Sequence, residues 1–278
     1  MIGLVASFVV FGSVAAVYLR GVRARRRRGL ARPPAASVAA MLAGLTVAAL
    51  VLDGPTDTMA DQLFWVHMLQ HLALITIVAP FVVLGEPVRA FEEVLPMGMR
   101  RALGRIEGRL WARDGAARRT AIAGLALSTI ALLAWHTPVA FQAALDDDPL
   151  HALEHLTLLA TALLFWWPIL TPGLRERIGT GFAIVEVLIA TIVMTALGAL
   201  LAFSPTVWYP AYSAAERVRG VGALADQQLA GLLMWIPSGL LYLAVIAWLF
   251  LRWIDADVVT AGEPASRRAP SPARSSAP

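Results

Sequence analysis

Five histidines, all of those in the chain, have the residue type and spacing best suited to chemistry. His67 and His71 form one H-x3-H pair, and His151 and His155 form a second. Residues four apart on a helix lie about 6 Å apart along its axis and share a face. Neutral imidazole binds copper, zinc, iron or nickel. Two such pairs on different helices could therefore offer four nitrogen ligands to one or two metal ions, with His136 as a fifth.

Softer ligands and polar neighbours extend this prediction. Met68 and Met234 lie in the same halves of apolar segments as the histidines, and their thioethers would favour Cu(I). Acidic and amide side chains close to the cluster would orient the ligands by hydrogen bonding. The predicted metal ligands are His67, His71, His136, His151, His155, Met68 and Met234, and the predicted orienting residues are Glu154, Asp226, Gln227 and Gln228.

Other roles for the histidines stay open at this point. A polar side chain inside a membrane can hydrogen-bond to a neighbouring helix or relay protons. Haem would take one imidazole from each of two opposing helices, which leaves the four-residue doubling unexplained. Asp148 and Pro149 predict the N-cap and first residue of a helix, so nearby acids such as Glu154 partly reflect the favourable charge at a helix start.

Motifs of common enzyme classes are absent from the sequence. There is no cysteine, which excludes disulfides, thiolate metal sites and a cysteine nucleophile, and there is no H-E-x-x-H, G-x-S-x-G or P-loop motif. Glu186 is the only acid deep in an apolar segment away from the histidines. It could carry protons, contact a partner, or pair with Arg175 or Arg177. We therefore expect a metal-handling protein and not an enzyme.

The elements that must position these residues are membrane helices. The chain is 58% apolar and 15% charged, with a mean hydropathy of +0.68, whereas a soluble domain is nearer half apolar and a quarter charged. Runs of about 17–25 apolar residues can cross a bilayer as helices. Seven such runs predict an all-α polytopic bundle of seven transmembrane helices, at residues 2–19, 35–52, 62–84, 120–137, 151–170, 182–203 and 229–253.

Arginine sets the expected orientation of this bundle. All 23 basic residues are arginine. All but Arg217 and Arg219 fall in segments that alternate with the apolar runs on one side: 20–34, 85–119, 171–181 and 252–278. Basic loops mark the cytoplasmic side, so we expect the N-terminus outside, the C-terminus in the cytoplasm and the histidines near the outer face. This asymmetry accounts for the basic charge without a nucleic-acid partner.

The sequence divides into three parts. Residues 1–34 are the first helix and an Arg-rich loop, residues 35–253 form a six-helix membrane domain, and residues 254–278 are a Pro-, Ala- and Ser-rich cytoplasmic tail that we expect to be disordered. Met99, Leu103, Ile106 and Leu110 recur at helical spacing between arginines. This pattern predicts either a basic amphipathic helix lying on anionic membrane lipid or a solvated linker helix.

A set of separated motifs runs through the membrane domain. The first is Phe64-Trp-Val-His-Met-Leu-Gln-His71, followed by Ala79-Pro80 and Leu84-Gly85-Glu86-Pro87. The others, in order, are Trp135-His-Thr-Pro138, His151-Ala-Leu-Glu-His155, Phe165-Trp-Trp-Pro168, Phe203-Ser-Pro205, Tyr209-Pro-Ala-Tyr212, Asp226-Gln-Gln228 and Met234-Trp235. Over about residues 35–253 this pattern resembles the CtaG-type, multi-span cytochrome c oxidase assembly factors of the caa3 oxidase family.

The resemblance implies an integral protein of the bacterial plasma membrane that matures a haem-copper oxidase. Cytochrome c oxidase subunits would be its protein partners, and copper would be the cargo that it handles or inserts. The alternatives are a haem-binding membrane redox protein and a metal-free scaffold or transporter. Because the chain has no cysteine, copper handover would use weaker imidazole and thioether ligands.

Overall fold

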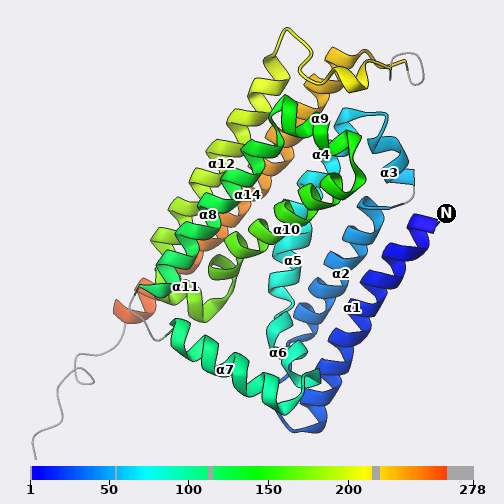
Figure 1. Ribbon diagram of the computed structural model, residues 1–278. Coiled ribbons are helices and arrows are strands. Elements are labelled where there is room, and N and C mark those ends of the chain that lie inside the picture. The colour runs from blue at the N-terminus through cyan, green and yellow to red at the C-terminus, as the bar shows by residue number, and fades with distance from the viewer. Residues whose placement is uncertain (1, 54, 112–114, 215–219, 262–278) are drawn as a thin grey trace, which may run out of the picture.

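The computed structural model describes the backbone of residues 2–53, 55–111, 115–214 and 220–261, and every regular element in these ranges is a helix. The predicted all-α class is therefore confirmed (Figure 1). The elements are α1 (Ile2–Arg27), α2 (Ala35–Val51), α3 (Pro55–Ala60), α4 (Phe64–Ala73), η1 (Leu74–Val78), α5 (Ala79–Leu84), α6 (Pro87–Phe91), η2 (Glu92–Val94), α7 (Met97–Trp111), α8 (Ala116–Trp135), α9 (Pro138–Asp146), α10 (Asp148–Leu170), α11 (Pro172–Ile178), α12 (Thr180–Phe203), η3 (Pro210–Ala214) and α14 (Ala223–Ala261).

Five helical stretches among the described residues are long and apolar enough to cross a membrane. They are Phe64–Leu84 (α4, η1 and α5), α8, α10, α12 and Ala223–Asp255 within α14. Helix α2 is apolar but has only 17 residues. Helix α1 contains the first predicted run and continues past it to Arg27. Five of the seven predicted spans thus correspond to helices able to cross a bilayer, and the count of seven stays a prediction.

One predicted boundary differs from the structure, and one predicted helix is confirmed. Helix α14 continues to Ala261, so residues 254–261 are helical and do not belong to a disordered tail, while residues 262–278 lie outside the described part. Helix α7 confirms the helix predicted between the basic residues. Met99 and Leu103 are exposed on it, whereas the side chains of Ile106 and Leu110 lie outside the description.

The central span is bent by a π-helical turn, η1, between α4 and α5. Such a turn shifts backbone hydrogen bonds from their α-helical partners and can leave a carbonyl without one. The indole N–H of Trp166 donates to the carbonyl of Ile75 within this turn, at 2.8 Å. Since Trp166 lies on α10 and is fully buried, the bond fixes the height of α10 against the central span.

Glycines let two pairs of helices approach closely. A methyl group on Gly231 of α14 would lie 2.4 Å from the amide of Ala202 and 2.5 Å from the carbonyl of Gly198, both on α12. On α8, a methyl group on Gly124 would lie 2.7 Å from the carbonyl of Leu164 on α10. Backbone-to-backbone packing through small residues is a common way to associate helices in lipid.

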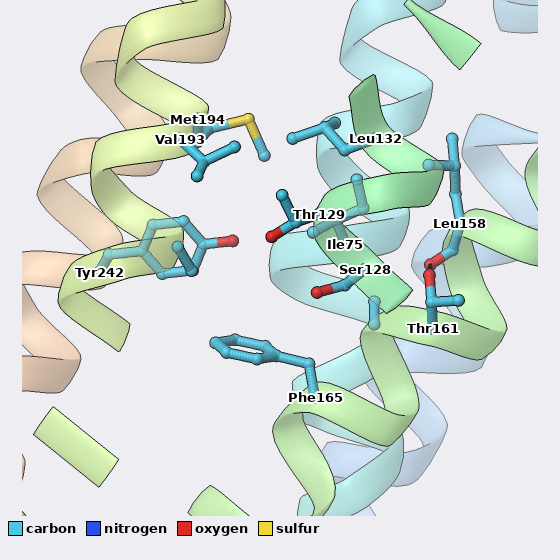
Figure 2. A pocket seen from close by; sticks show the side chains of 12 residues that line it. Ile75, Ser128, Thr129, Leu132, Leu158, Thr161, Phe165, Val193, Met194 and Tyr242 are labelled. Carbon is cyan, nitrogen blue, oxygen red and sulfur yellow. Dashed lines mark hydrogen bonds between the residues drawn. The ribbon is translucent and has the colours of Figure 1, made fainter. Parts of the chain in front are cut away.

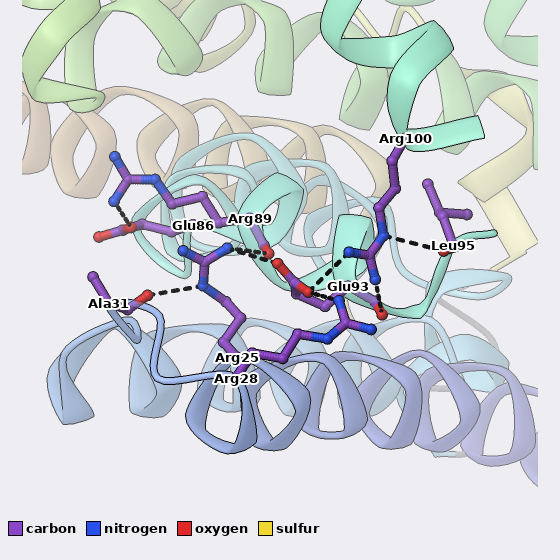
Figure 3. A network of polar contacts seen from close by, with 8 residues as sticks. All are labelled: Arg25, Arg28, Ala31, Glu86, Arg89, Glu93, Leu95 and Arg100. Carbon is purple, nitrogen blue, oxygen red and sulfur yellow. Dashed lines mark hydrogen bonds and ion pairs between the residues drawn. The ribbon is translucent and has the colours of Figure 1, made fainter. Parts of the chain in front are cut away.

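The N-terminal helix is held by two polar contacts at its Arg-rich end. The hydroxyl of Tyr18 donates to the carbonyl of Gly85 at 2.7 Å. Arg25, Arg28 and Arg100 surround the buried carboxylate of Glu93 (Figure 3), at 3.2 Å for Arg25 and 3.1 Å for Arg100. A buried carboxylate with several charged donors is well compensated. This network joins α1, η2 and α7.

The two ends of the bundle differ in chemistry. Helices α6, α7 and α11 and the last turns of α1 lie at one end (bottom of Figure 1), and α3 and α9 lie at the other. The described arginines of segments 20–34, 85–119 and 171–181 belong to the first end. We call it the Arg-rich end and the opposite one the His end.

The glycine contacts give a test of the α12–α14 packing. Gly231→Ala should destabilise the protein, because the added methyl group forces the helices apart at a typical cost of about 1–3 kcal/mol. Gly239→Ala on the same helix is the matched control, since a methyl group there meets nothing within 4 Å. It should be neutral or slightly stabilising, because alanine favours helix over glycine. Thermal unfolding of both variants in detergent measures the difference, and equal midpoints would contradict the packing.

Candidate metal centre

The five imidazole rings lie together at the His end. His67 and His71 come from α4, His136 follows the last residue of α8, and His151 and His155 come from the first two turns of α10. Neighbouring ring centroids are 4.4–5.8 Å apart, from the His151–His155 pair to the His67–His155 pair. The convergence expected from the two H-x3-H pairs is therefore present in the fold.

Capping side chains set the first residues of α4 and α10, two of the helices that carry histidines. The carboxylate of Asp226 on α14 accepts the backbone N–H groups of Phe64 and Trp65, at 2.8 and 2.9 Å. Helix α10 is capped by Asp147, whose carboxylate accepts the amide of Leu150 at 2.8 Å. The predicted cap, Asp148, is instead the first helical residue. Both helix starts are thus set by side chains that satisfy otherwise unpaired amides.

The donor atoms of the cluster are spaced for one ion. The Nε2 atoms of His67 and His71 lie 3.0 Å apart, and the carboxylate of Glu154 lies 3.9 Å from the first and 3.6 Å from the second. Two nitrogens bound about 2.0 Å from one tetrahedral ion lie about 3.3 Å apart. A second set of donors, from His67, His151 and His155, also lies within 4.8 Å of one another. His67 belongs to both sets.

Several of these polar atoms are buried without a hydrogen-bond partner among the described residues. They are Nδ1 of His71, Nε2 of His151, Nε2 of His155 and both carboxylate oxygens of Glu154. Buried polar groups are normally paired, and an unpaired one costs free energy. A bound cation would compensate several of these atoms, and the set combines imidazole nitrogens with a carboxylate, as metal sites do.

His136 and Met68 add a soft pair of donors. Nδ1 of His136 lies 2.7 Å from the carbonyl of Leu132, and Nε2 lies 3.2 Å from the sulfur of Met68. Burial lowers the pKa of His136 to about 4, so the ring is neutral at pH 7. Because a carbonyl only accepts, the single ring proton sits on Nδ1. Two lone pairs, one on nitrogen and one on sulfur, therefore face each other, an arrangement that suits a soft cation.

Aromatic side chains that we did not predict as site residues cover the cluster. The hydroxyl of Tyr212 lies 3.3 Å from Nδ1 of His67, and Tyr209 donates to the carbonyl of His136 at 2.7 Å. Burial raises the pKa of both hydroxyls, so they stay protonated. By accepting from Nδ1, Tyr212 can hold His67 in the tautomer that leaves Nε2 free to coordinate. The Tyr209-Pro-Ala-Tyr212 motif was the available signal.

Phe64 and Phe141 complete this aromatic cover. The Phe64 ring lies 5.4 Å from Phe141 and 4.4 Å from Tyr209, centroid to centroid, and Phe141 lies 4.9 Å from His67. All these aromatic residues are buried. His67, His71 and His136 are buried as well, whereas His151 and His155 are partly exposed. Access to the cluster is therefore on the side of α10.

The other predicted residues lie beside the cluster without contacting a ring. Asp226 caps α4, as described above. Gln227 accepts the amide of Trp208 at 2.6 Å, and Gln228 donates to the carbonyl of Ser204 at 3.3 Å. Both glutamines thus hold the segment that carries Tyr209 and Tyr212. Met234 is buried in the main apolar core, and no described contact joins it to a histidine.

A small cavity lies deeper in the bundle, lined by residues of α8, α10, α12 and α14 (Figure 2). It holds about 30 Å³, enough for one water. The side chains of Thr129 and Tyr242 point into it (Figure 2). Glu186 is one helical turn from Ala190, which lines this cavity, and its buried carboxylate has no hydrogen-bond partner among the described residues. Glu186 is therefore separate from the histidine cluster.

The chain is similar to known proteins over most of its length. Two uncharacterized proteins, one from Mycobacterium bovis and one from Mycobacterium tuberculosis, are each 29% identical to the chain over 257 residues. The match covers 86% of this chain but 37% of each relative, so the chain spans well under half of the length of these relatives. No solved structure matches.

A family match covers most of the chain and carries more information than these relatives. Residues 16–256 match the family described as cytochrome c oxidase caa3 assembly factor. The matched range begins within α1 and ends beyond the last predicted span, so it includes all five histidines and every helix that positions them. The chain belongs to the cytochrome c oxidase caa3 assembly factor family.

Proposed function

We propose that this protein handles copper for the assembly of a cytochrome c oxidase, through the histidine cluster at the His end. The observation that carries the proposal is the convergence of five imidazoles, one carboxylate and one thioether in a largely buried space. An assembly factor for a haem-copper oxidase has a reason to bind such a metal. Copper is here a cargo that is received and passed on.

Copper fits the donor set better than zinc does. Structural zinc sites use thiolates, imidazoles and carboxylates, whereas thioethers select Cu(I). The facing lone pairs of His136 and Met68 are one such imidazole–thioether pair. With no cysteine in the chain, the ligands are weak enough to release the ion to a partner.

The shared ligand suggests how the ion moves. The partly exposed pair His151 and His155 would receive it, with His67 as the third ligand. His67 also belongs to the inner set with His71 and Glu154. Exchange of the outer ligands for the inner ones, with His67 kept throughout, moves the ion inward without releasing it.

Orientation follows from the distribution of charge. The arginines would keep the Arg-rich end in the cytoplasm of a bacterial cell. The His end would then face outward, where oxidase subunits receive the copper. Haem is the weaker alternative, because the rings of His67 and His151, on opposing helices, are direct neighbours with centroids 5.1 Å apart, which leaves no room for a macrocycle between them.

Metal titration of the purified protein tests the ligands. Met68→Leu conserves volume and removes the sulfur, so the fold should tolerate it. It should weaken Cu(I) binding by about 10–100-fold. Loss of a residue that only orients a ligand has an effect of this size, and loss of a direct ligand should have at least the same effect. It should also remove the copper–sulfur signal from X-ray absorption spectra.

Met234→Leu is the matched control, since Met234 is equally buried but contacts no histidine. It should keep both the affinity and the copper–sulfur signal. The reverse result, loss with Met234→Leu alone, would assign the thioether to α14. If purified preparations show a Soret band and no copper affinity, the ligand is haem and the copper proposal is wrong.

A deletion strain tests the cellular role. The variant with both His67→Ala and His155→Ala should fail to restore oxidase activity and oxidase copper content, because both donor sets lose a ligand. Immunoblotting of membranes should show wild-type levels of the variant. Added copper in the medium should partly restore activity, as expected when delivery and not scaffolding is lost. Full complementation by this variant would leave only a scaffold role.

A further inference from the structure

A second, larger cavity lies at the Arg-rich end, away from the histidines. It holds about 910 Å³ and is lined by α5, α6, α10, α11 and α14. Two candidate spans end at its walls, at Leu84 and Leu170, and Arg252 lies three residues before the end of a third, Ala223–Asp255. The cavity therefore lies where apolar helix surface gives way to charged connections, which is the level of lipid headgroups.

Two arginines share one aromatic ring in this cavity. The guanidinium of Arg175 lies 5.1 Å from the centroid of Trp248, and that of Arg252 lies 5.6 Å from it. Burial and the nearby charge of Arg252 lower the pKa of Arg175, and the opposing attraction of Glu176 is weaker than either. Neither arginine forms an ion pair with a described carboxylate. The cavity wall also carries Glu176, but its attraction for Arg175 is weaker than the repulsion from Arg252, so a further anion between the two guanidinium groups would stabilise both.

The rest of the cavity wall has an apolar part and a part of mixed charge, which includes Glu86, Arg89, Glu92, Glu176 and Arg177. Leu84, Val88, Trp167 and Leu170 line it with hydrocarbon and indole surface. On the wall from α6, Glu86 is paired with Arg89 at 2.8 Å. The two arginines that share Trp248 thus lie in the same cavity as this apolar surface.

We propose that this cavity binds an anionic phospholipid, with its phosphate between Arg175 and Arg252 and an acyl chain along Trp167 and Leu84. Basic pockets between the ends of membrane helices recognise acidic lipid headgroups in this way. Arginine suits phosphate because its planar group can donate two hydrogen bonds. A soluble anion would need only the charges, whereas the adjoining apolar wall requires a ligand with a hydrocarbon part. The site is independent of the copper proposal.

Native mass spectrometry of the full-length protein in detergent tests this, with dioleoylphosphatidylglycerol and dioleoylphosphatidylcholine as probes. Wild type should prefer the acidic lipid. The Arg175→Gln, Arg252→Gln double variant should lose roughly 30-fold of that preference, the value for two basic residues near an acidic headgroup. Arg101→Gln is the control, because it removes one charge from the exposed face of α7 at the same end and should change little.

Two results would overturn the proposal. One is an unchanged preference in the double variant, or an equal loss in Arg101→Gln, which would leave only general charge attraction. The other is displacement of phosphatidylglycerol by equimolar inorganic phosphate, which would make the site a phosphate site without lipid. If the double variant fails to fold, Arg252→Gln alone decides, since Arg252 is exposed and its loss leaves no buried gap.

Discussion

The desolvation of polar side chains inside an apolar helix bundle is the constraint on which this structure depends. Most buried polar groups meet it by pairing with backbone. The carboxylate of Asp226 accepts two backbone N–H groups of α4. Trp166 donates to a carbonyl of η1, and Tyr18 donates to the carbonyl of Gly85. These bonds fix helix positions, and the groups that form them have no free donor or acceptor aimed at a ligand. The histidine cluster is different, because its nitrogens and the Glu154 carboxylate are buried with partners missing. Among the described residues, Asp53, Gln70 and Glu186 also carry unpaired buried atoms, but the cluster gathers such atoms from several residues at one point, which favours a bound ligand.

The bundle also places its histidines and most of its described arginines at opposite ends. Imidazoles gather at the His end, and guanidinium groups gather at the other. At the Arg-rich end the arginines divide further. Glu93 forms ion pairs with three of them and so ties α1 to α7. Arg175 and Arg252 form no such ion pair and lie against Trp248. Arginine thus joins helices where it is paired with a buried carboxylate, and it would be available to bind a ligand where it is not.

Local patterns predicted most of the fold and the centre of the site. Apolar run length located the helices, and the four-residue spacing located two histidine pairs on single faces. Contacts between distant segments could not be read from the sequence. Asp226 is 162 residues from the amide of Phe64 that it caps, so its role was taken for ligand orientation. Met68 and Met234 were equivalent by sequence, and only packing places the first against His136. The π turn and the Tyr212 contact also arise from packing.

The absence of cysteine acquires a physical meaning in this setting. A thiolate site would have to carry negative charge into the bundle and would hold Cu(I) tightly. Neutral imidazole and thioether donors avoid the cost of burying that charge. Five imidazoles and the thioether of Met68 share one small space, so number can replace strength. A cation bound there would be stabilised by several weak bonds, each of which could be exchanged singly. Release would then proceed in small steps with a ligand always retained, as a transfer site requires and a storage site does not.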